Sequence, residues 1–311
     1  MLVSNGGNCK MARVSIVIPS RVETYEVSAG VSVLQRTVQD IYKKATGDFE
    51  VIVAFDGPPY QSFPDYPNLI KMQNEWQGTK PTVNAAVNIA TGKYIFKSDS
   101  HCMFAEGFDE ILQMNMEDNW VVTPRMYILD AENWKWQDER FYDYFRLPCP
   151  FNYKRGFLFQ AGGHWPERTA ERLDIPIDEN MKLHGSAWFM NRDYYLDCLG
   201  GIISDGSGTW NGEDIDITMR TWLGSWNGKL MVNKNTWYAH MHRGGQRPRG
   251  YGFSHNEAYA SARWSAKYWM SNLWDARVHD IEWLIDRFSP IPGWPENWKE
   301  LYKDWKNEQT N

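Results

Sequence analysis

Short apolar runs alternate with an amphipathic segment at the start of the chain. Residues 14–19 read Val-Ser-Ile-Val-Ile-Pro, and residues 49–55 read Phe-Glu-Val-Ile-Val-Ala-Phe. Both runs predict buried strands, because they are short, rich in β-branched residues and ended by Pro or by a following Asp-Gly. Between them, residues 32–44 place apolar side chains at helical spacing. This order predicts a strand–helix–strand unit of a parallel sheet.

The same alternation continues to the end of the first third of the chain. Residues 68–72 predict a weak strand, residues 83–90 a helix of small residues, and residues 94–96 another strand. The resulting order predicts an α/β fold with a doubly wound, mostly parallel sheet. No Gly-x-Gly-x-x-Gly follows the first strand, and no Gly-x-x-x-x-Gly-Lys-Ser/Thr occurs anywhere. Dinucleotide binding and P-loop chemistry are therefore not expected.

The second half is less regular. Residues 134–153 are aromatic and charged without clean periodicity, residues 162–166 predict a loop, and His164 is expected at the surface. The remaining expected elements are strands at 120–124, 183–190 and 229–233, a helix opening at 192–195 and a helix from about 213 to 223.

The C-terminal part is rich in tryptophan. Seven of the 17 Trp follow Ala260, most of them in segments with helical patterning that Pro290 to Pro295 interrupts. We expect a catalytic domain at 1–257 and a helical C-terminal extension at 258–311. Its tryptophans are interpreted mainly as core, with an aromatic platform for the acceptor as the alternative.

The composition indicates the cellular compartment of the protein and limits the partners that it can bind. The net charge of −6 argues against a surface built to bind phosphate backbones. The four cysteines, including Cys9 and Cys102, are scattered without metal spacing, which favours a reducing compartment. No apolar run approaches the roughly 20 residues of a membrane span, and Met1 to Lys10 lacks a signal-peptide core. These features predict a cytoplasmic protein.

Polar residues follow two of the predicted strands. Asp56 ends one strand, and Asp99 and His101 end another. Carboxyl ends of parallel strands form the ligand-binding edge of such sheets. Asp99 and His101 are two residues apart and project to the same side. Their oxygen and nitrogen ligands suit manganese better than calcium. Alternatively, Asp56 caps a turn and the other two are a polar strand end without a metal.

Three acids open the helix predicted near residue 213. Glu213, Asp214 and Asp216 lie in its first turn, where they complement the helix dipole. They exceed what a helix start requires, and like charges this close should raise one another's pKa. A raised pKa suits a general base that works near neutral pH.

Together these segments resemble a glycosyltransferase of the GT-A fold, from about Val14 to Arg243. The opening is similar to the large inverting family that contains chondroitin and cellulose synthases. Asp99-Ser100-His101-Cys102 resembles the Asp-Ser-His-Cys of polypeptide N-acetylgalactosaminyltransferases. The matching segments are 15–19, 50–57, 84–92 and 98–101.

The resemblance implies metal-dependent transfer of a hexosyl group from a nucleoside-diphosphate sugar, expected to be a UDP-sugar. It implies Mn²⁺ or Mg²⁺ bound by Asp99, His101 and His240, with His242 as the alternative to His240. The donor is expected to contact Pro19, Arg21, Asp56, Lys80, Asp99 and Arg243.

The glycine-rich, basic segment 243–252 is expected to close over the diphosphate and exclude water, or to be a solvated loop.

The two resemblances disagree on stereochemistry. The inverting enzymes have Glu-Asp where this chain has Glu213-Asp214, and there the Asp deprotonates the acceptor. The N-acetylgalactosaminyltransferases have Trp-Gly-Gly-Glu-Asn and retain configuration. We expect inversion with Asp214 as base and Glu213 orienting the donor sugar or acceptor.

The acceptor is not determined by the sequence. The resembling Golgi enzymes carry a membrane anchor, and none is seen here, which favours a bacterial or phage-infected cytoplasm. Acceptors there include glycans, proteins and, in phage, hydroxymethylated DNA bases. Two other classes remain: an inactive transferase-like module that binds sugars or nucleic acid, and a nucleotidyltransferase. The latter lacks the expected glycine-rich basic loop after the first strand.

Overall fold

The computed structural model describes residues 13–151, 154, 156–159, 162–209, 212–242, 250–251 and 254–310. The strands are β1 (Val14–Ser20), β2 (Glu26–Ser28), β3 (Val31–Ser32), β4 (Phe49–Asp56), β5 (Leu69–Asn74), β6 (Tyr94–Ser98), β7 (Cys102–Phe104), β8 (Trp120–Asp130), β9 (Lys135–Tyr142), β10 (Ile177–Glu179), β11 (Ala187–Asn191) and β12 (Lys229–His240). The helices are α1 (Val33–Lys44), α2 (Thr79–Ile89), α3 (Phe108–Gln113), α4 (Pro166–Glu171), the π-helix η1 (Tyr194–Leu199), α5 (Glu213–Leu223), α6 (His255–Met270), α7 (Ile281–Phe288) and α8 (Trp298–Thr310).

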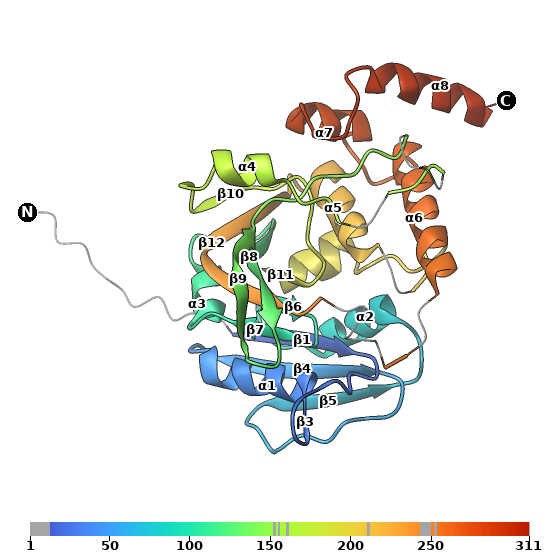
Figure 1. Ribbon diagram of the computed structural model, residues 1–311. Helices are drawn as coiled ribbons and strands as arrows, with labels where there is room; N and C mark the ends of the chain where they lie inside the picture. The colour runs from blue at the N-terminus through green and yellow to red at the C-terminus, as the bar shows by residue number, and fades with distance from the viewer. Residues whose placement is uncertain are drawn as a thin grey trace, which may run out of the picture.

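One large sheet organises the molecule (Figure 1). Its main path runs β10-β12-β8-β11-β6-β1-β4-β5, with β7 on β12 and β9 on β8. Parallel pairs join β1 to β4 and β6, β4 to β5, and β8 to β12. The carboxyl ends of these strands therefore meet at one edge, where ligands bind in open α/β sheets.

Helices cover both faces of the parallel part. Val17 and Ile52 share a buried cluster with Val83 of α2. The alternate positions Ile16 and Ile18 share a second cluster with Leu34, Val38 and Ile41 of α1. Because strand side chains alternate between faces, a continuous apolar run is what a strand covered on both sides requires. The expected α/β fold is confirmed.

The middle of the chain differs from the sequence-based expectation. Strand β11 is antiparallel and lies between β6 and β8. It begins at Ala187, so residues 183–186 are loop rather than the predicted strand. Strand β9 was not predicted, because within the described residues it pairs only with β8 and its exposed positions carry polar side chains. His164, expected at the surface, is half-buried against Tyr142.

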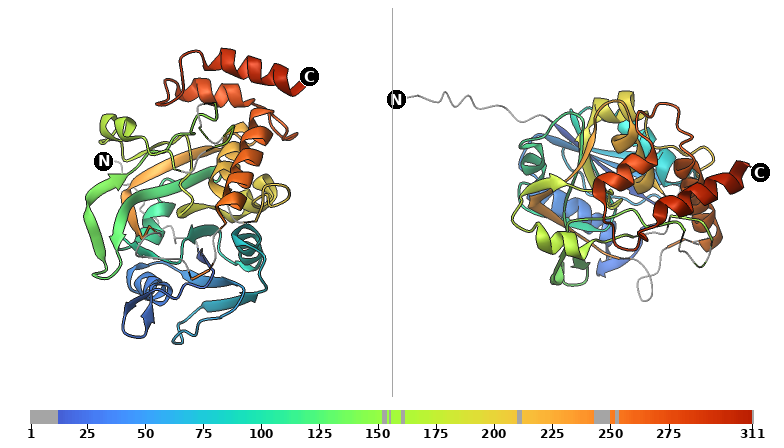
Figure 2. Two further views of the ribbon diagram at one scale, coloured as in Figure 1. Left: turned by 45° about the vertical axis from the view of Figure 1, so that its right-hand side comes forward. Right: turned by 90° about the horizontal axis from the view of Figure 1, so that it is seen from above.

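The C-terminal helices, orange and red in Figure 2, lie at one end of the molecule and add residues to the main hydrophobic core. Trp269, Trp298 and Tyr302 are buried in one cluster with Ile217 and Trp222 of α5. Four more tryptophans of this part pack partly buried against the same cluster, at positions 274, 283, 294 and 305. This packing supports the interpretation of these tryptophans as core. The boundary at residue 258 stays a prediction, and α6 begins at His255, just before it.

None of the helices in the described residues is long and apolar enough to cross a bilayer.

Candidate active site

A pocket of about 360 Å³ lies at the carboxyl edge of the parallel strands. Pro19 and Arg21 enter it from the end of β1, Asp56 from the end of β4, Asp99 from the end of β6 and His240 from the end of β12. The N-terminus of α5 adds Glu213 and Asp214 to the lining. The topology of the sheet thus gathers residues that are far apart along the chain.

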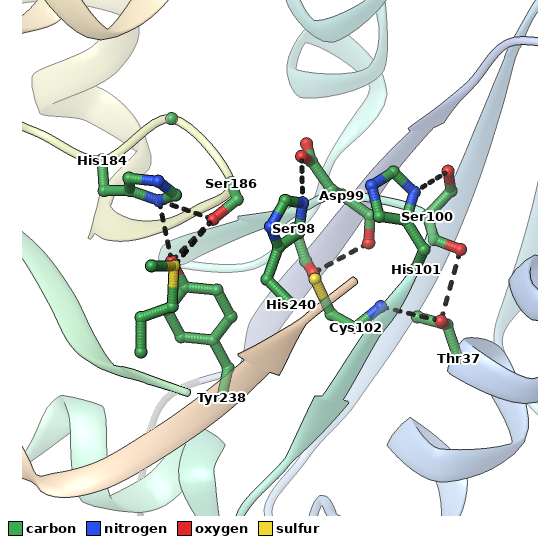
Figure 3. Close-up of polar contacts among 12 residues, drawn as sticks. Thr37, Ser98, Asp99, Ser100, His101, Cys102, His184, Ser186, Tyr238 and His240 are labelled. Atoms are coloured by element: carbon green, nitrogen blue, oxygen red, sulfur yellow. Dashed lines mark hydrogen bonds and ion pairs between the residues drawn. The ribbon is translucent and has the colours of Figure 1, made fainter. Parts of the chain in front are cut away.

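Three side chains of this pocket, Asp99, His101 and His240, form a candidate metal centre. One ligand atom from each of Asp99, His101 and His240 lies within 4.8 Å of the others. His240 Nε2 is 3.2 Å from Asp99 Oδ2 (Figure 3). Burial lowers the pKa of His240 to about 4, although the contact with Asp99 opposes the shift. The imidazole is therefore neutral near pH 7, the form that coordinates a metal. One carboxylate and two imidazoles fit a borderline divalent cation such as Mn²⁺.

Glu23 supports this centre from behind His101. Its Oε2 lies 3.0 Å from His101 Nδ1 and accepts a hydrogen bond from Ser100 at 3.3 Å. A carboxylate on the far nitrogen of a metal-binding imidazole fixes its tautomer and orientation. Sequence reasoning missed Glu23, because it lies in a polar loop with no distinguishing pattern.

Helix α1 holds the loop that carries His101. Thr37 Oγ1 accepts a hydrogen bond from the Cys102 backbone N–H at 3.0 Å and donates to the Ser100 carbonyl at 3.3 Å (Figure 3). Asp40 accepts a hydrogen bond from the Phe104 N–H at 2.8 Å. The backbone after β6 is therefore tied to a helix that is itself packed in the core.

Lys97 joins the metal centre to α5. Its fully buried Nζ donates to Asp99 Oδ1 and Glu213 Oε1, both at 2.8 Å, and to the Gly185 carbonyl at 2.6 Å. Burial alone would lower the pKa of Lys97, but the two carboxylates raise it well above its usual value. Burial alone would likewise raise the pKa of Asp99, but Lys97 and the two histidines hold it far below its usual range. Sequence reasoning gave Lys97 no role.

The three acids of α5 have separate surroundings. Glu213 faces Lys97, and its pKa is raised mainly by burial. Asp214 lies at the pocket with Oδ2 against Nζ of the buried Lys182. Asp216 turns away to Arg220, at 2.5 Å. The expected mutual repulsion is therefore not the main cause of the shift at Glu213.

Only one of the two carboxylate oxygens of Asp56 accepts hydrogen bonds within the described residues, and the other is called its open oxygen below. Its Oδ1 accepts hydrogen bonds from the backbone N–H groups of Gln77 and Gly78, each at 2.8 Å. Its buried Oδ2 makes no hydrogen bond within the described residues and lies 3.8 Å from Arg21 Nη1. A buried carboxylate oxygen without a hydrogen bond marks a place for a ligand donor.

Aromatic rings hold Arg21 on two sides. Its guanidinium carbon is 4.8 Å from the centre of the Trp76 ring and 4.9 Å from that of Tyr251. Gly57, at φ +81°, allows Trp76 to approach, because a Cβ there would lie 2.1 Å from the indole. Arg21 is thus held at the rim beside Asp56.

A polar group underlies the metal centre. His184 Nδ1 lies 2.6 Å from Ser186 Oγ and 3.0 Å from the hydroxyl of Tyr238 (Figure 3). His184 is half-buried at the edge of the pocket, and burial lowers its pKa well below the usual value. A neutral His184 adds no charge beneath His240, whose ring centre is 6.2 Å away.

One predicted donor residue, Lys80, lies outside the pocket. Lys80 is fully buried and donates to Ser207 Oγ at 2.8 Å, and it does not line the pocket. Its predicted contact with the donor is not favoured by this position. Arg243 and the rest of 243–249 lie outside the described residues. His242 lines the pocket, but His240 is the histidine that joins the metal cluster.

The sheet topology and the pocket at the carboxyl ends of its strands are those of the GT-A fold. The structure of GalNAc-T7, determined with UDP, GalNAc and Mn²⁺, matches 93% of this chain and 59% of its own length, with a TM-score of 0.66 and 15% identity. Residues 15–198, more than half of the chain, match glycosyl transferase family 2. The chain belongs to that family.

Two curated relatives are similar over a shorter stretch. The putative polypeptide N-acetylgalactosaminyltransferase 13 of Drosophila melanogaster is 25% identical over 152 residues, 45% of this chain and 24% of the relative. The polypeptide N-acetylgalactosaminyltransferase 5 of Caenorhabditis elegans is 24% identical over 142 residues, 43% of this chain and 21% of the relative. The matches therefore span a quarter or less of those proteins.

Proposed function

We propose that this protein is a metal-dependent glycosyltransferase that uses a nucleoside-diphosphate sugar, most simply a UDP-sugar. The observation that carries the proposal is the meeting of Asp99, His101 and His240 in a pocket that also contains Asp56 and Asp214. A metal there, held by the first three residues, would neutralise charge on the departing diphosphate. Membership of glycosyl transferase family 2 supports the reaction class.

The open oxygen of Asp56 is proposed to accept the N–H of the base. Arg21, held between Trp76 and Tyr251 at the rim, supplies N–H donors and positive charge to the nucleotide. Both groups are held in place by contacts within the chain before a ligand arrives. Such preorganisation reduces the entropy cost of donor binding.

Asp214 is proposed as the base that takes the proton of the acceptor hydroxyl, with inversion at the sugar. Lys182 engages only its Oδ2, and Oδ1 makes no hydrogen bond within the described residues. The ion pair with Lys182 keeps the carboxylate turned toward the pocket. Glu213, anchored on Lys97, is proposed to orient the donor sugar or acceptor.

A glycan or protein acceptor is proposed. The pocket lysines Lys97 and Lys182 are buried and engaged by carboxylates, so they offer no contact to the phosphates of a DNA acceptor. Location in the cytoplasm of a bacterial or phage-infected cell stays a prediction.

The first experiment is calorimetric titration of UDP into the protein with Mn²⁺ and with chelator. We expect binding that requires the metal and is lost in His240→Ala. His279→Ala, which changes a histidine in the C-terminal part, is the matched control and should bind as the unchanged protein does. Metal-independent binding in all three would contradict the proposed centre.

A donor screen then separates the remaining classes. Release of UDP with transfer to an acceptor supports the transferase, whereas release of pyrophosphate from UTP and a sugar phosphate supports a nucleotidyltransferase. Binding without turnover on any acceptor would favour the inactive module. The anomeric configuration of the product, measured by NMR, tests inversion.

A further inference from the structure

A second pocket of about 360 Å³ lies beside α1, away from the metal centre. Helix α1 forms one wall, and Trp134, Trp237 and residues of β7 form the others. Trp134 belongs to the turn that joins β8 to β9, whose tip comes down beside α1 (Figures 1 and 2). Within the described residues, this pocket shares no lining residue with the first. It is therefore a separate site.

The aromatic side of this α1 pocket is held firmly. The backbone of Trp134 is in the left-handed region, at φ 50°, which is unfavourable for a bulky side chain. Its indole N–H donates to Asp40 Oδ1 at 3.0 Å. Trp237 packs edge-to-face on Trp136, with ring centres 4.9 Å apart. Both pocket indoles are nevertheless only partly buried. Their position is set by the fold, and strained backbone that persists is a reason to look for function.

The α1 side supplies polar groups. Arg36, Gln39 and Lys43 are three and four residues apart, so they lie along one face of the helix. The guanidinium carbon of Arg36 is 5.3 Å from the Trp134 ring centre, and stacking of this kind leaves its edge N–H groups available. Lys43 is exposed, and within the described residues neither it nor Gln39 makes a hydrogen bond or ion pair through its side chain. Basic residues in the last turn also complement the helix dipole, but that does not explain the indoles facing them.

The charge balance of the pocket is positive. The carboxylate of Asp40 is buried, and its two oxygens accept from Trp134 and from the Phe104 backbone. Lys44 is paired with Glu106 at 2.8 Å. Arg36 and Lys43 are left as cations in a chain whose net charge is −6. A ligand that uses both walls needs a face that packs on indole and an anionic group.

We propose that the α1 pocket binds an acidic saccharide, one that carries a carboxylate, sulfate or phosphate group. The apolar face of the sugar ring packs on the indoles, and the anionic group pairs with Arg36 and Lys43. Gln39 forms a hydrogen bond with a sugar hydroxyl. A free inorganic anion makes no use of the indoles, and a neutral sugar makes no use of the two cations. This binding is independent of donor chemistry at the metal centre and goes beyond the proposed function.

The test is calorimetric titration of the full chain with two tetrasaccharides. One alternates glucuronic acid with N-acetylglucosamine, and the other is the neutral tetramer of N-acetylglucosamine. We expect the acidic probe to bind at least about tenfold more tightly, with an affinity that weakens as salt is added. The double variant Arg36→Ala/Lys43→Ala should lose at least about tenfold for the acidic probe only. Trp134→Ala should weaken both probes.

The matched control is Lys71→Ala/Arg263→Ala, which removes the same two charges from exposed positions on other elements. It should bind the acidic probe as the unchanged protein does. Equal affinity for the two probes, undiminished binding in Arg36→Ala/Lys43→Ala, or no binding of the acidic probe would overturn the proposal. Inorganic phosphate binding as tightly as the acidic probe would do the same. Titration of UDP with Mn²⁺ into each variant should give unchanged affinity, which separates this site from the metal centre.

Discussion

Lys97 Nζ lies 2.8 Å from both Asp99 Oδ1 and Glu213 Oε1, so one buried cation joins the candidate metal ligand to the first turn of α5. Removing one partner of a buried ion pair leaves a charge without compensation, at a typical loss of about 3–5 kcal/mol. We therefore expect Lys97→Met to lower the free energy of unfolding by about 3 kcal/mol or more. Chemical denaturation without metal measures this, with the exposed Lys71→Met as control.

Mn²⁺ should then stabilise Lys97→Met more than the unchanged protein. The metal supplies the positive charge that Asp99 has lost, and a ligand that binds only the folded state raises its stability. Melting curves with and without Mn²⁺ measure the difference. Equal shifts in the two proteins would show that Lys97 does not compensate the charge of the metal centre.

Glu23 is expected to act through His101 rather than on the substrate. Its Oε2 is 3.0 Å from His101 Nδ1, and loss of such a partner typically weakens metal binding by about 10- to 100-fold. Glu23→Gln should show this loss in direct Mn²⁺ titration. Glu26→Gln, which changes an exposed residue on the nearby β2, should not. An unchanged Mn²⁺ affinity in Glu23→Gln would remove Glu23 from the centre.

Asp56→Asn tests the open oxygen. The amide can keep its carbonyl on the N–H groups of Gln77 and Gly78, so stability should change little. It would place an N–H₂ donor where a buried carboxylate oxygen now makes no hydrogen bond within the described residues. Loss of a hydrogen bond to a charged group is worth about 1.5–3 kcal/mol, so UDP should bind about 10- to 100-fold more weakly. Equal UDP affinity by calorimetry would show that the base is held elsewhere.

Asp214→Asn and Asp216→Asn should differ in kind. Asp214 lies at the pocket, and loss of a general base costs about 10²- to 10⁴-fold in rate. Its variant should therefore lose turnover while keeping its affinity for UDP with Mn²⁺. Each variant leaves a buried cation, Lys182 or Arg220, without its carboxylate partner, so both should lose stability. Asp216 does not line the pocket, so its folded variant should keep its turnover. Steady-state rates, UDP titration and denaturation of both variants separate the two roles, and full turnover in Asp214→Asn would exclude it as base.

Glu50 provides a test of acid stability far from the pocket. Burial alone would raise the pKa of Glu50, but hydrogen bonds from Ser15 at 2.6 Å and from the Thr91 N–H at 2.7 Å lower it below the ordinary 4.5. A depressed pKa stabilises the fold above the unfolded value, and this stabilisation is lost as the pH falls through the folded value.

Glu50→Gln should therefore be less stable by about 1–3 kcal/mol at pH 7. The difference should shrink as the pH falls below the ordinary 4.5 of a glutamate. Denaturation curves across this range measure it. A difference that does not depend on pH would mean that the charge of Glu50 is not what these donors stabilise.

Sequence patterns were sufficient for the strands that form the parallel part of the sheet and for the placement of Asp56, Asp99 and His101. The reason is general: a short apolar run predicts a buried strand, and parallel strands bring their carboxyl ends to one edge. His240 was found only through a family resemblance, since its strand carries no periodic signal that singles out a ligand. The role of each of these residues stays a prediction until it is measured.

Only the tertiary structure decided which side chains meet. Lys97 with Glu213, Lys182 with Asp214 and Glu23 with His101 join elements far apart in the sequence, and no local pattern encodes such pairs. The packing also determined which polar residues are kept from the pocket. Lys80, which the sequence predicts to contact the donor, is buried and donates to Ser207 in the interior. Local spacing determines which segments form strands and helices, whereas the partner of a buried charge depends on every element packed around it.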